Sequence, residues 1–431
     1  MTGEWAQAAS AQDAETILRA RMDQLRTEMR IPGAVARVMR HGRPVVDLSW
    51  GEATLGGTAP TISTVFRIAS MTKSFTAATV LLLRDRGLLR LDDAVTDFLP
   101  MRQRDGAAVC IRDLLTMNAG LPTDDPWGDR QESLPYADFD AMVGQGLSFT
   151  SMPRTQFEYS NAGYAILGRI ISIVTGRDYL DVVTDELLRP LGMDSSTFWA
   201  SKVPSSRLAT GYAEFAAGMT PVDPVPPGAF SAMGGLHSTI EDLSIWVRGF
   251  AGGSQHPVRW ESRREMATPM NLARLVSLGD AATATSYGFG LMSEAHSSLG
   301  RFVHHSGGYP GFGSHMRWHE GSGWAVILLA NRTYANMRRV AEEVMYDLVA
   351  LDSGERTHPR EGSELPDLWM STEQAVRVCE QLLVDWNDDL ADEWFAVNVD
   401  LDRPREERRA AWRAAGEGIS GFVREKVSSQ S

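Results

Sequence analysis

Hydrophobic and polar residues near the start of the chain follow two different periods. Within Ala14–Met29, leucine and methionine recur at every third or fourth position, which predicts an amphipathic helix. The next two segments, Ala34–Met39 and Val45–Trp50, are rich in β-forming residues and flank a turn at His41-Gly42. Short apolar runs separated by a glycine turn predict a β-hairpin. The chain therefore begins with a helix and two antiparallel strands.

A strongly apolar helix is expected next. The short strand Val65–Ile68 leads directly into the segment Ser70–Arg86, which Gly87 ends. Apolar residues surround this second segment instead of forming a single stripe. A helix of that kind is buried inside a protein.

The middle of the chain, from Leu88 to about Leu299, has mostly the pattern of helices and loops. Three helices are predicted within it, at Ile111–Asn118, Ala162–Thr175 and Ile240–Phe250. The first two stop at glycines, and the third opens with a Ser/Thr and acidic capping pattern.

Strand character returns near residue 300. The segments Phe302–His305, Gly313–His319 and Trp324–Ala330 predict strands, and Met337–Leu351 predicts a helix with one apolar face. The two ends of this region are thus rich in strands and carry flanking helices. We predict an α+β fold, with an antiparallel sheet built from both ends, terminal helices against it and a helical insertion between them.

The chain changes character after residue 351. We predict one domain over residues 1–351, with sheet parts at about 14–87 and 300–351 and a helical part at about 88–299. A polar, proline-containing linker is predicted for residues 352–370. Residues 371–431 look helical, acidic and tryptophan-bearing, which predicts a C-terminal helical appendage.

Composition narrows the class of protein. The chain has 431 residues and a formal net charge of −13, and this acidity argues against a nucleic-acid partner. Two cysteines cannot build a disulfide framework. The apolar runs are too short to cross a membrane, and the N-terminus lacks the pattern of an export signal. We therefore expect a cytoplasmic protein without a membrane partner, and its oligomeric state stays open.

The basic residues are almost all arginine. Of 42 basic residues only three are lysine, namely Lys73, Lys202 and Lys426. Arginine is effectively never deprotonated, whereas a buried lysine can lose its proton. A lysine kept in this background is therefore a candidate for proton transfer.

Ser70 and Lys73 form the strongest chemical signal. They lie three residues apart where the predicted strand enters the buried helix, so the lysine amine can reach the serine hydroxyl. Burial favours the neutral, basic amine, and the helix N-terminus favours a developing oxyanion. This pair predicts an activated serine nucleophile. The alternative is a serine that caps the helix beside a lysine that extends to solvent.

Two further segments carry candidate residues. Tyr159 and Asn161 precede a predicted helix, where a tyrosine near a lysine can act as a general base and an amide can bind a substrate carbonyl. His305, Gly307 and Gly308 end a predicted strand, where glycines allow close approach of the backbone to a ligand and a strand edge can supply an oxyanion N–H group. Ordinary packing, helix capping and a glycine-rich turn are the alternatives.

Together these three segments resemble the serine β-lactamase and penicillin-binding protein superfamily, in its class C β-lactamase-like branch. The order S-x-x-K, Y-x-N and H-x-G is the order of that family's motifs, with histidine where lysine is usual. Flanking segments such as LLTMNAGLP and SAMGGLHSTIEDL are also similar to those of the family, and the resemblance spans about residues 15–350.

The resemblance implies a role for each candidate. Ser70 is then the acylated nucleophile, Lys73 and Tyr159 share the proton transfers, and Asn161 orients the substrate. The backbone N–H groups of Ser70 and Gly308 form the oxyanion hole. Four residues are expected at the cleft, although the aromatic ones could equally belong to the core: Trp127, Tyr212, Gly234 and Tyr309. No metal and no cofactor are expected.

His305 is a departure from the β-lactamase pattern. Lysine offers a permanent cation to a substrate carboxylate, whereas histidine is largely neutral at pH 7. The resemblance is then closer to esterases, D-aminopeptidases and related amidases. We expect a serine hydrolase acting on small acyl esters. A D-amino-acid amidase or peptidase, a weak β-lactamase, an acyltransferase and an inactive binding protein on the same fold stay open.

Overall fold

The computed structural model of the protein describes residues 9–101, 108–124, 127–215, 218–252, 255–278, 281–354, 370–395 and 405–416. The chain divides into two compact units, Met1–His358 and Pro359–Ser431. Most of the predicted linker, residues 355–369, lies outside the described residues.

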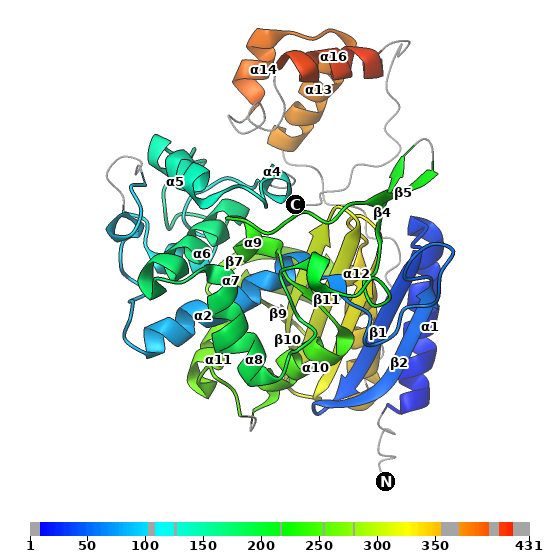
Figure 1. Ribbon diagram of the computed structural model, residues 1–431. Helices are drawn as coiled ribbons and strands as arrows, with labels where there is room; N and C mark the ends of the chain where they lie inside the picture. The colour runs from blue at the N-terminus through cyan, green and yellow to red at the C-terminus, as the bar shows by residue number, and fades with distance from the viewer. Residues whose placement is uncertain are drawn as a thin grey trace. The chain divides into compact units, whose positions relative to one another are not determined.

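One antiparallel sheet of eight strands organises the first unit (Figure 1). The strand order is β2-β1-β12-β11-β10-β9-β8-β7. The strands are β1 (Gly33–Arg40), β2 (Arg43–Gly51), β7 (Asn271–Leu278), β8 (Ala281–Tyr287), β9 (Met292–His296), β10 (Gly300–Tyr309), β11 (Phe312–His319) and β12 (Trp324–Ala330). Strand β1 pairs with β12, with Ala34 opposite Ala330. This pairing confirms that both ends of the region build one sheet.

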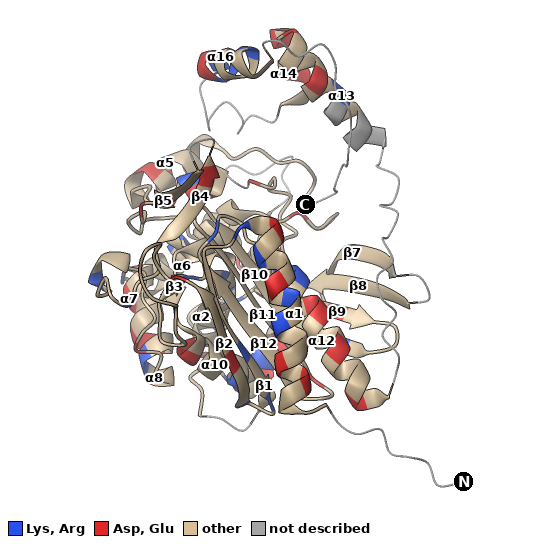
Figure 2. Cartoon of the chain, turned by 90° about the vertical axis from the view of Figure 1, so that its right-hand side faces the viewer, with Lys and Arg blue, Asp and Glu red and all other residues tan. Residues whose placement is uncertain are grey.

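Two helices from opposite ends of the unit cover one face of the sheet. Helix α1 (Ala11–Met29) and helix α12 (Met337–Ser353) lie side by side, and both carry many charged residues (Figure 2). A capping box between Ser10 and Asp13 begins α1. Both helices bury their apolar faces against β1, β2 and β12 in a common hydrophobic cluster.

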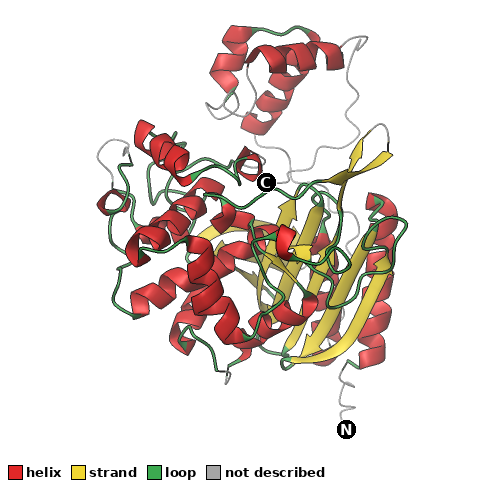
Figure 3. Ribbon diagram, in the orientation of Figure 1, coloured by secondary structure: helices red, strands yellow, loops and turns green. Residues whose placement is uncertain are grey.

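The other face of the sheet is covered by a group of helices (Figure 3). Helix α2 (Thr72–Asp85) runs through their centre, and all its residues up to Leu83 are buried, as its all-round apolar pattern predicts. The surrounding helices are α3 (Ile111–Leu115), α4 (Trp127–Arg130), α5 (Tyr136–Gln145), α6 (Asn161–Thr175), α7 (Tyr179–Val183), α8 (Arg189–Leu191), α9 (Ser231–Gly234), α10 (Ile240–Arg248) and α11 (Trp260–Met266).

Short elements connect these helices to the sheet. The small strand pairs are β3 (Phe66–Arg67) with β6 (His237–Ser238) and β4 (Gly211–Phe215) with β5 (Gly218–Val222). The short turns are η1 (Ala69–Met71), η2 (Val95–Asp97), the π-helical η3 (Thr184–Leu188), η4 (Ala200–Lys202) and η5 (Gly249–Ala251).

The segment 88–299, predicted to be mostly helices and loops, also contributes strands to the main sheet. Strands β7, β8 and β9 lie in this segment and extend the main sheet. Strands β8 and β9 consist mainly of small or polar residues, and the leucines of β7 do not alternate, with Leu272 and Leu275 exposed. Because these strands bury few large apolar residues, the apolar pattern that marks a strand is weak there.

The second unit contains three described helices. They are α13 (Met370–Val384), α14 (Asp388–Trp394) and α16 (Arg405–Gly416), and they fall in the segment predicted to be a helical appendage. Leu382, Trp386 and Ala391 form its small buried cluster, against which Trp412 packs. Within the described residues of the whole chain, none of the helices combines the length and apolarity needed to cross a membrane.

Candidate active site

Ser70 lies at a sharp turn between a strand and a buried helix. Strand β3 ends at Arg67, and the chain then passes through η1 into α2. Ala69 has a φ of 47°, a left-handed conformation that costs roughly 1–2 kcal/mol for a residue with a Cβ atom. The Thr72 hydroxyl donates to the Ala69 carbonyl at 2.7 Å and so stabilises the turn. Such local strain is found most often at functional sites.

Lys73 follows Ser70 by one turn, and its side chain is fully buried. Its Nζ atom lies 2.9 Å from Ser70 Oγ, 2.7 Å from Asn161 Oδ1 and 2.8 Å from the carbonyl oxygen of Met233. The buried amine is therefore held among oxygen atoms and directed at the serine hydroxyl. The spacing of three residues along the chain thus lets the Lys73 amine reach the Ser70 hydroxyl.

Asn161 is directed toward Lys73 by the way α6 begins. Ser160 is the N-cap of this helix and accepts the backbone N–H of Gly163, which leaves the Asn161 side chain available for the amine. The buried carboxylate of Asp124 accepts the backbone N–H groups of Asn161 and Ala162, both at 2.7 Å. Sequence reasoning missed Asp124, since nothing local connects it with a helix that begins 37 residues later.

Tyr159 joins the other two motifs in space. Its ring centroid lies 4.8 Å from Lys73 Nζ and 6.4 Å from the centroid of the His305 ring. The ring also meets that of Tyr287 edge-on at 6.2 Å. The structure thus brings together three segments that lie far apart in the sequence.

Strand β10 presents a free edge to Ser70. It pairs with β11 along its whole length but with β9 only from Gly300 to His304, so its last residues have one open side. That part of β10 lies against η1. A Cβ atom at Gly307 would meet the Ile68 carbonyl oxygen at 2.1 Å, which explains the need for glycine. Gly308 follows on the same open edge.

His305 is buried and held in a neutral form. Its Nδ1 atom lies 2.6 Å from the Ser306 carbonyl oxygen, and because a carbonyl only accepts, Nδ1 carries the proton. Nε2 then accepts from the Tyr287 hydroxyl at 3.2 Å. Burial lowers the pKa of His305 to about 3. The side chain therefore offers no cation at neutral pH.

A buried ion pair supports the backbone beside Ser70. A Cβ atom at Gly234 would lie 3.8 Å from the backbone nitrogen of Ser70, so this glycine lies beside the serine. Arg67 donates to the Gly234 carbonyl at 2.9 Å and pairs with Glu132, and both charged groups are buried. Arg67 was missed in the sequence analysis, although a charged residue inside the apolar run just before Ser70 was a usable signal.

The three aromatic candidates have their own packing contacts. Trp127 packs edge-on against Phe230, with ring centroids 5.6 Å apart. The Tyr309 ring lies under the Arg67 guanidinium at 3.4 Å, and its hydroxyl donates to the Asp129 carbonyl. These contacts place Tyr309 in the supporting layer of the site.

Tyr212 lies in β4, and its hydroxyl accepts the backbone N–H of Leu55. The Tyr212 hydroxyl thus contacts the loop after β2. None of the hydrogen bonds described for Ser70, Lys73 or His305 involves Tyr212. Among the residues that the structure describes, no group of three histidine, cysteine, aspartate or glutamate side chains is placed to hold a metal ion.

Comparison with known proteins agrees with this arrangement. The sequence model of the family described as Beta-lactamase matches residues 18–350. The protein Flp of Staphylococcus aureus strain MW2 is 28% identical over 336 residues, which cover 74% of this chain and 63% of that protein. Penicillin-binding protein 4* of Bacillus subtilis is 27% identical over 63% of this chain and 61% of its own. This chain thus spans less than two thirds of the length of these relatives.

A solved structure has the same fold. The octameric penicillin-binding protein homologue from Pyrococcus abyssi superposes with a TM-score of 0.69, at 26% identity, over 85% of this chain and 82% of that one. The family match covers most of the first unit, and the sheet with its two helical layers agrees with it. The chain therefore belongs to the β-lactamase family, whose members are serine hydrolases.

Proposed function

We propose that this protein hydrolyses esters of small carboxylic acids through an acyl-enzyme on Ser70. The observation that carries the proposal is the 2.9 Å contact between the fully buried amine of Lys73 and the hydroxyl of Ser70. The serine hydroxyl, a weak nucleophile, thus has the lysine amine beside it as a base, and Asn161 orients that base.

The first half of the reaction forms the acyl-enzyme. The neutral Lys73 amine accepts the Ser70 proton while Oγ attacks the ester carbonyl carbon, giving a tetrahedral oxyanion. The backbone N–H groups of Ser70 and Gly308 are the proposed donors to that oxyanion. Collapse breaks the bond to the alcohol, whose oxygen takes a proton from Tyr159. The alcohol leaves, and the acyl group stays on Ser70.

The second half releases the acid. Water attacks the acyl carbonyl and gives up its proton to Tyr159, which now acts as the base. The bond to Ser70 Oγ breaks, and Oγ regains a proton from Lys73. One ester and one water thus yield one acid and one alcohol, and the enzyme returns to its starting state.

The environment of His305 favours an ester over a β-lactam. A β-lactam carries a carboxylate that gains from a nearby cation. The imidazole of His305 is buried and bonded to Tyr287 and Ser306, and its lowered pKa keeps it neutral. A neutral ester does not need that cation.

The test is a panel of chromogenic substrates on the purified full chain. We expect p-nitrophenyl butyrate to be turned over faster than D-alanine p-nitroanilide and faster than nitrocefin. The Ser70→Ala variant, matched by its melting temperature, should lose ester turnover. Faster hydrolysis of the anilide or of nitrocefin would replace the ester assignment. Equal ester turnover by Ser70→Ala would remove Ser70 from the mechanism. Added methanol separates hydrolysis from acyl transfer, through the yield of methyl ester.

A further inference from the structure

A cavity in the first unit is lined by residues other than those of the Ser70 cluster. Its volume is about 330 Å³, within the range of sites for small molecules. Its walls come from the β1–β2 turn at His41-Gly42, the end of α10, helix α11, and the turn between β11 and β12. Near its start, strand β11 pairs with β10, with Gly313 opposite Gly308, and it reaches the cavity at Trp318. Five residues of strand separate Gly313 from Trp318, which is about 17 Å.

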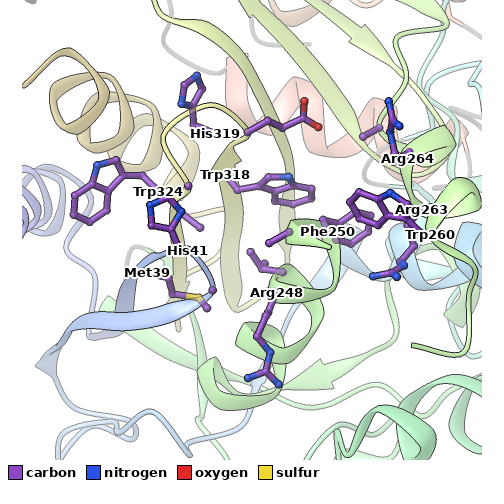
Figure 4. Close-up of a pocket in the computed structure, with 17 residues that line it drawn as sticks. Met39, His41, Arg248, Phe250, Trp260, Arg263, Arg264, Trp318, His319 and Trp324 are labelled. Carbon is purple, nitrogen blue, oxygen red and sulfur yellow. The ribbon is translucent and has the colours of Figure 1, made fainter. Parts of the chain in front are cut away.

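Aromatic rings form the central walls of this cavity. In Figure 4, Trp318 and Phe250 lie in the middle, Trp260 on one side and Trp324 on the other. The rings of Phe250 and Trp318 lie 4.9 Å apart and are inclined by 30°. Trp260 is partly exposed, with 37% of its surface accessible. Flat apolar ligands stack well on surfaces of this kind.

The charge of the cavity wall is positive. Arg248, Arg263 and Arg264 line it, and within the described part of the chain none of them forms a salt bridge. The one acidic residue in the wall, Glu320, is paired with Arg301 at 2.7 Å. Three unpaired arginines around one cavity are unexpected in a chain whose net charge is −13.

Arg263 is the most unusual of the three. Only 3% of it is exposed, and its Nε atom has no hydrogen-bond partner in the structure. One guanidinium nitrogen donates to the Gly249 carbonyl at the end of α10, and the group lies 5.1 Å from the Trp260 ring centroid. Burial lowers the pKa of Arg263. A helix end supplies only a partial negative charge, whereas a buried cation normally requires an anion.

We propose that this cavity binds a flat aromatic anion, with an aromatic carboxylate as the chemical class. The carboxylate pairs with the guanidinium of Arg263, and the ring lies against Phe250, Trp260 and Trp318. This pairing gives a close anionic partner to a guanidinium that forms no salt bridge within the described residues. The cavity is thus a second ligand site, separate from the hydrolytic one.

The probe for this site is naphthalene-2-carboxylate, titrated calorimetrically into the full chain. We expect one saturable site, with binding at least tenfold weaker for the uncharged naphthalene-2-carboxamide. Arg263→Leu and Trp260→Ala should each weaken binding by tenfold or more. Arg259→Leu is the matched control, because this exposed arginine in the same region does not line the cavity. Ser70→Ala should bind the probe unchanged, which separates this site from the catalytic one.

Several results would overturn the proposal. They are the absence of saturable binding, equal affinity for the amide, unchanged affinity in Trp260→Ala, and loss of binding in Ser70→Ala. If Arg263→Leu does not fold, as judged by circular dichroism, Arg264→Leu takes its place. That exposed arginine lines the same cavity, so its loss should weaken binding at least threefold, and an unchanged affinity would reject the proposal.

Discussion

Replacing Lys73 by arginine tests the proposed proton transfer most directly. The substitution keeps a basic side chain in the buried site but removes the group that can accept a proton, because arginine stays protonated in proteins. The Lys73 amine lies within hydrogen-bond distance of three oxygen atoms, those of Ser70, Asn161 and Met233. A planar guanidinium cannot reproduce that arrangement around a single nitrogen.

The expected loss follows from the role assigned to the amine. A positioned general base contributes about 10²–10⁴-fold to the rate. The kcat/KM for p-nitrophenyl butyrate should therefore fall by about 10²–10⁴, or roughly 3–5 kcal/mol of transition-state stabilisation. The larger side chain also enters a fully buried site, which costs about 1–3 kcal/mol of folding stability.

The assay compares initial rates of ester hydrolysis at a temperature where each variant is folded, as judged by circular dichroism. Lys202→Arg is the matched control, because it makes the same chemical change at a surface lysine beside Trp199. This control should keep normal kcat and KM. If Lys73→Arg also keeps more than a tenth of the normal turnover, Lys73 does not transfer the proton and the mechanism proposed above is wrong.

Three more outcomes are expected. His305→Lys should raise nitrocefin turnover, since lysine offers a cation to the substrate carboxylate, and unchanged initial rates would contradict our explanation of the neutral histidine. Asp124→Ala removes the acceptor for two backbone N–H groups at the start of α6, so urea denaturation should show a loss of about 1–3 kcal/mol. Asp124→Asn should lose less, and equal losses would argue against this role of the carboxylate. The pKa of His305 is about 3 in the folded chain and about 6.5 in the unfolded chain. Between these pH values only the unfolded chain binds the proton. The stability contributed by neutral His305 is therefore lost as pH falls from 6.5 toward 3. The free energy of unfolding, measured with urea from pH 6.5 to 4, should therefore depend less steeply on pH in His305→Gln than in the unmodified protein. The difference in slope should be up to about 1.4 kcal/mol per pH unit. Superimposable pH profiles of the two proteins would refute this expectation.

The elements at both ends of the first unit were predictable from the sequence alone. The apolar residues of α1 and α12 recur at helical spacing, because each helix buries one face against the sheet, and β12 is a continuous apolar run that is buried along its whole length. Strands β7 to β9 escaped detection because β8 and β9 consist mainly of small or polar residues and the exposed leucines of β7 do not alternate. Only their pairing with β10 and with one another makes them strands.

In the candidate site, too, some residues could be predicted from the sequence and others could not. Ser70, Lys73, Tyr159 and His305 could be proposed because each lies in a short motif whose spacing has chemical meaning. The groups that hold them in place could not be found in this way. Asp124, Glu132 and the Met233 carbonyl act across loops, and their partners are defined only by tertiary contacts. Single acidic residues and backbone oxygens carry no signal of such pairing.

The pairing of β1 with β12 has a consequence for the synthesis of the protein. Ala34 leaves the ribosome long before its partner Ala330, and at about 5–20 residues per second the delay is roughly 15–60 s. During that time the hairpin β1–β2 has no strand on its inner edge, and open strand edges are prone to unwanted pairing. Ser70 likewise waits for the glycines of β10. A nascent chain must therefore stay unassociated until its last strand emerges, and catalytic competence arises late in translation.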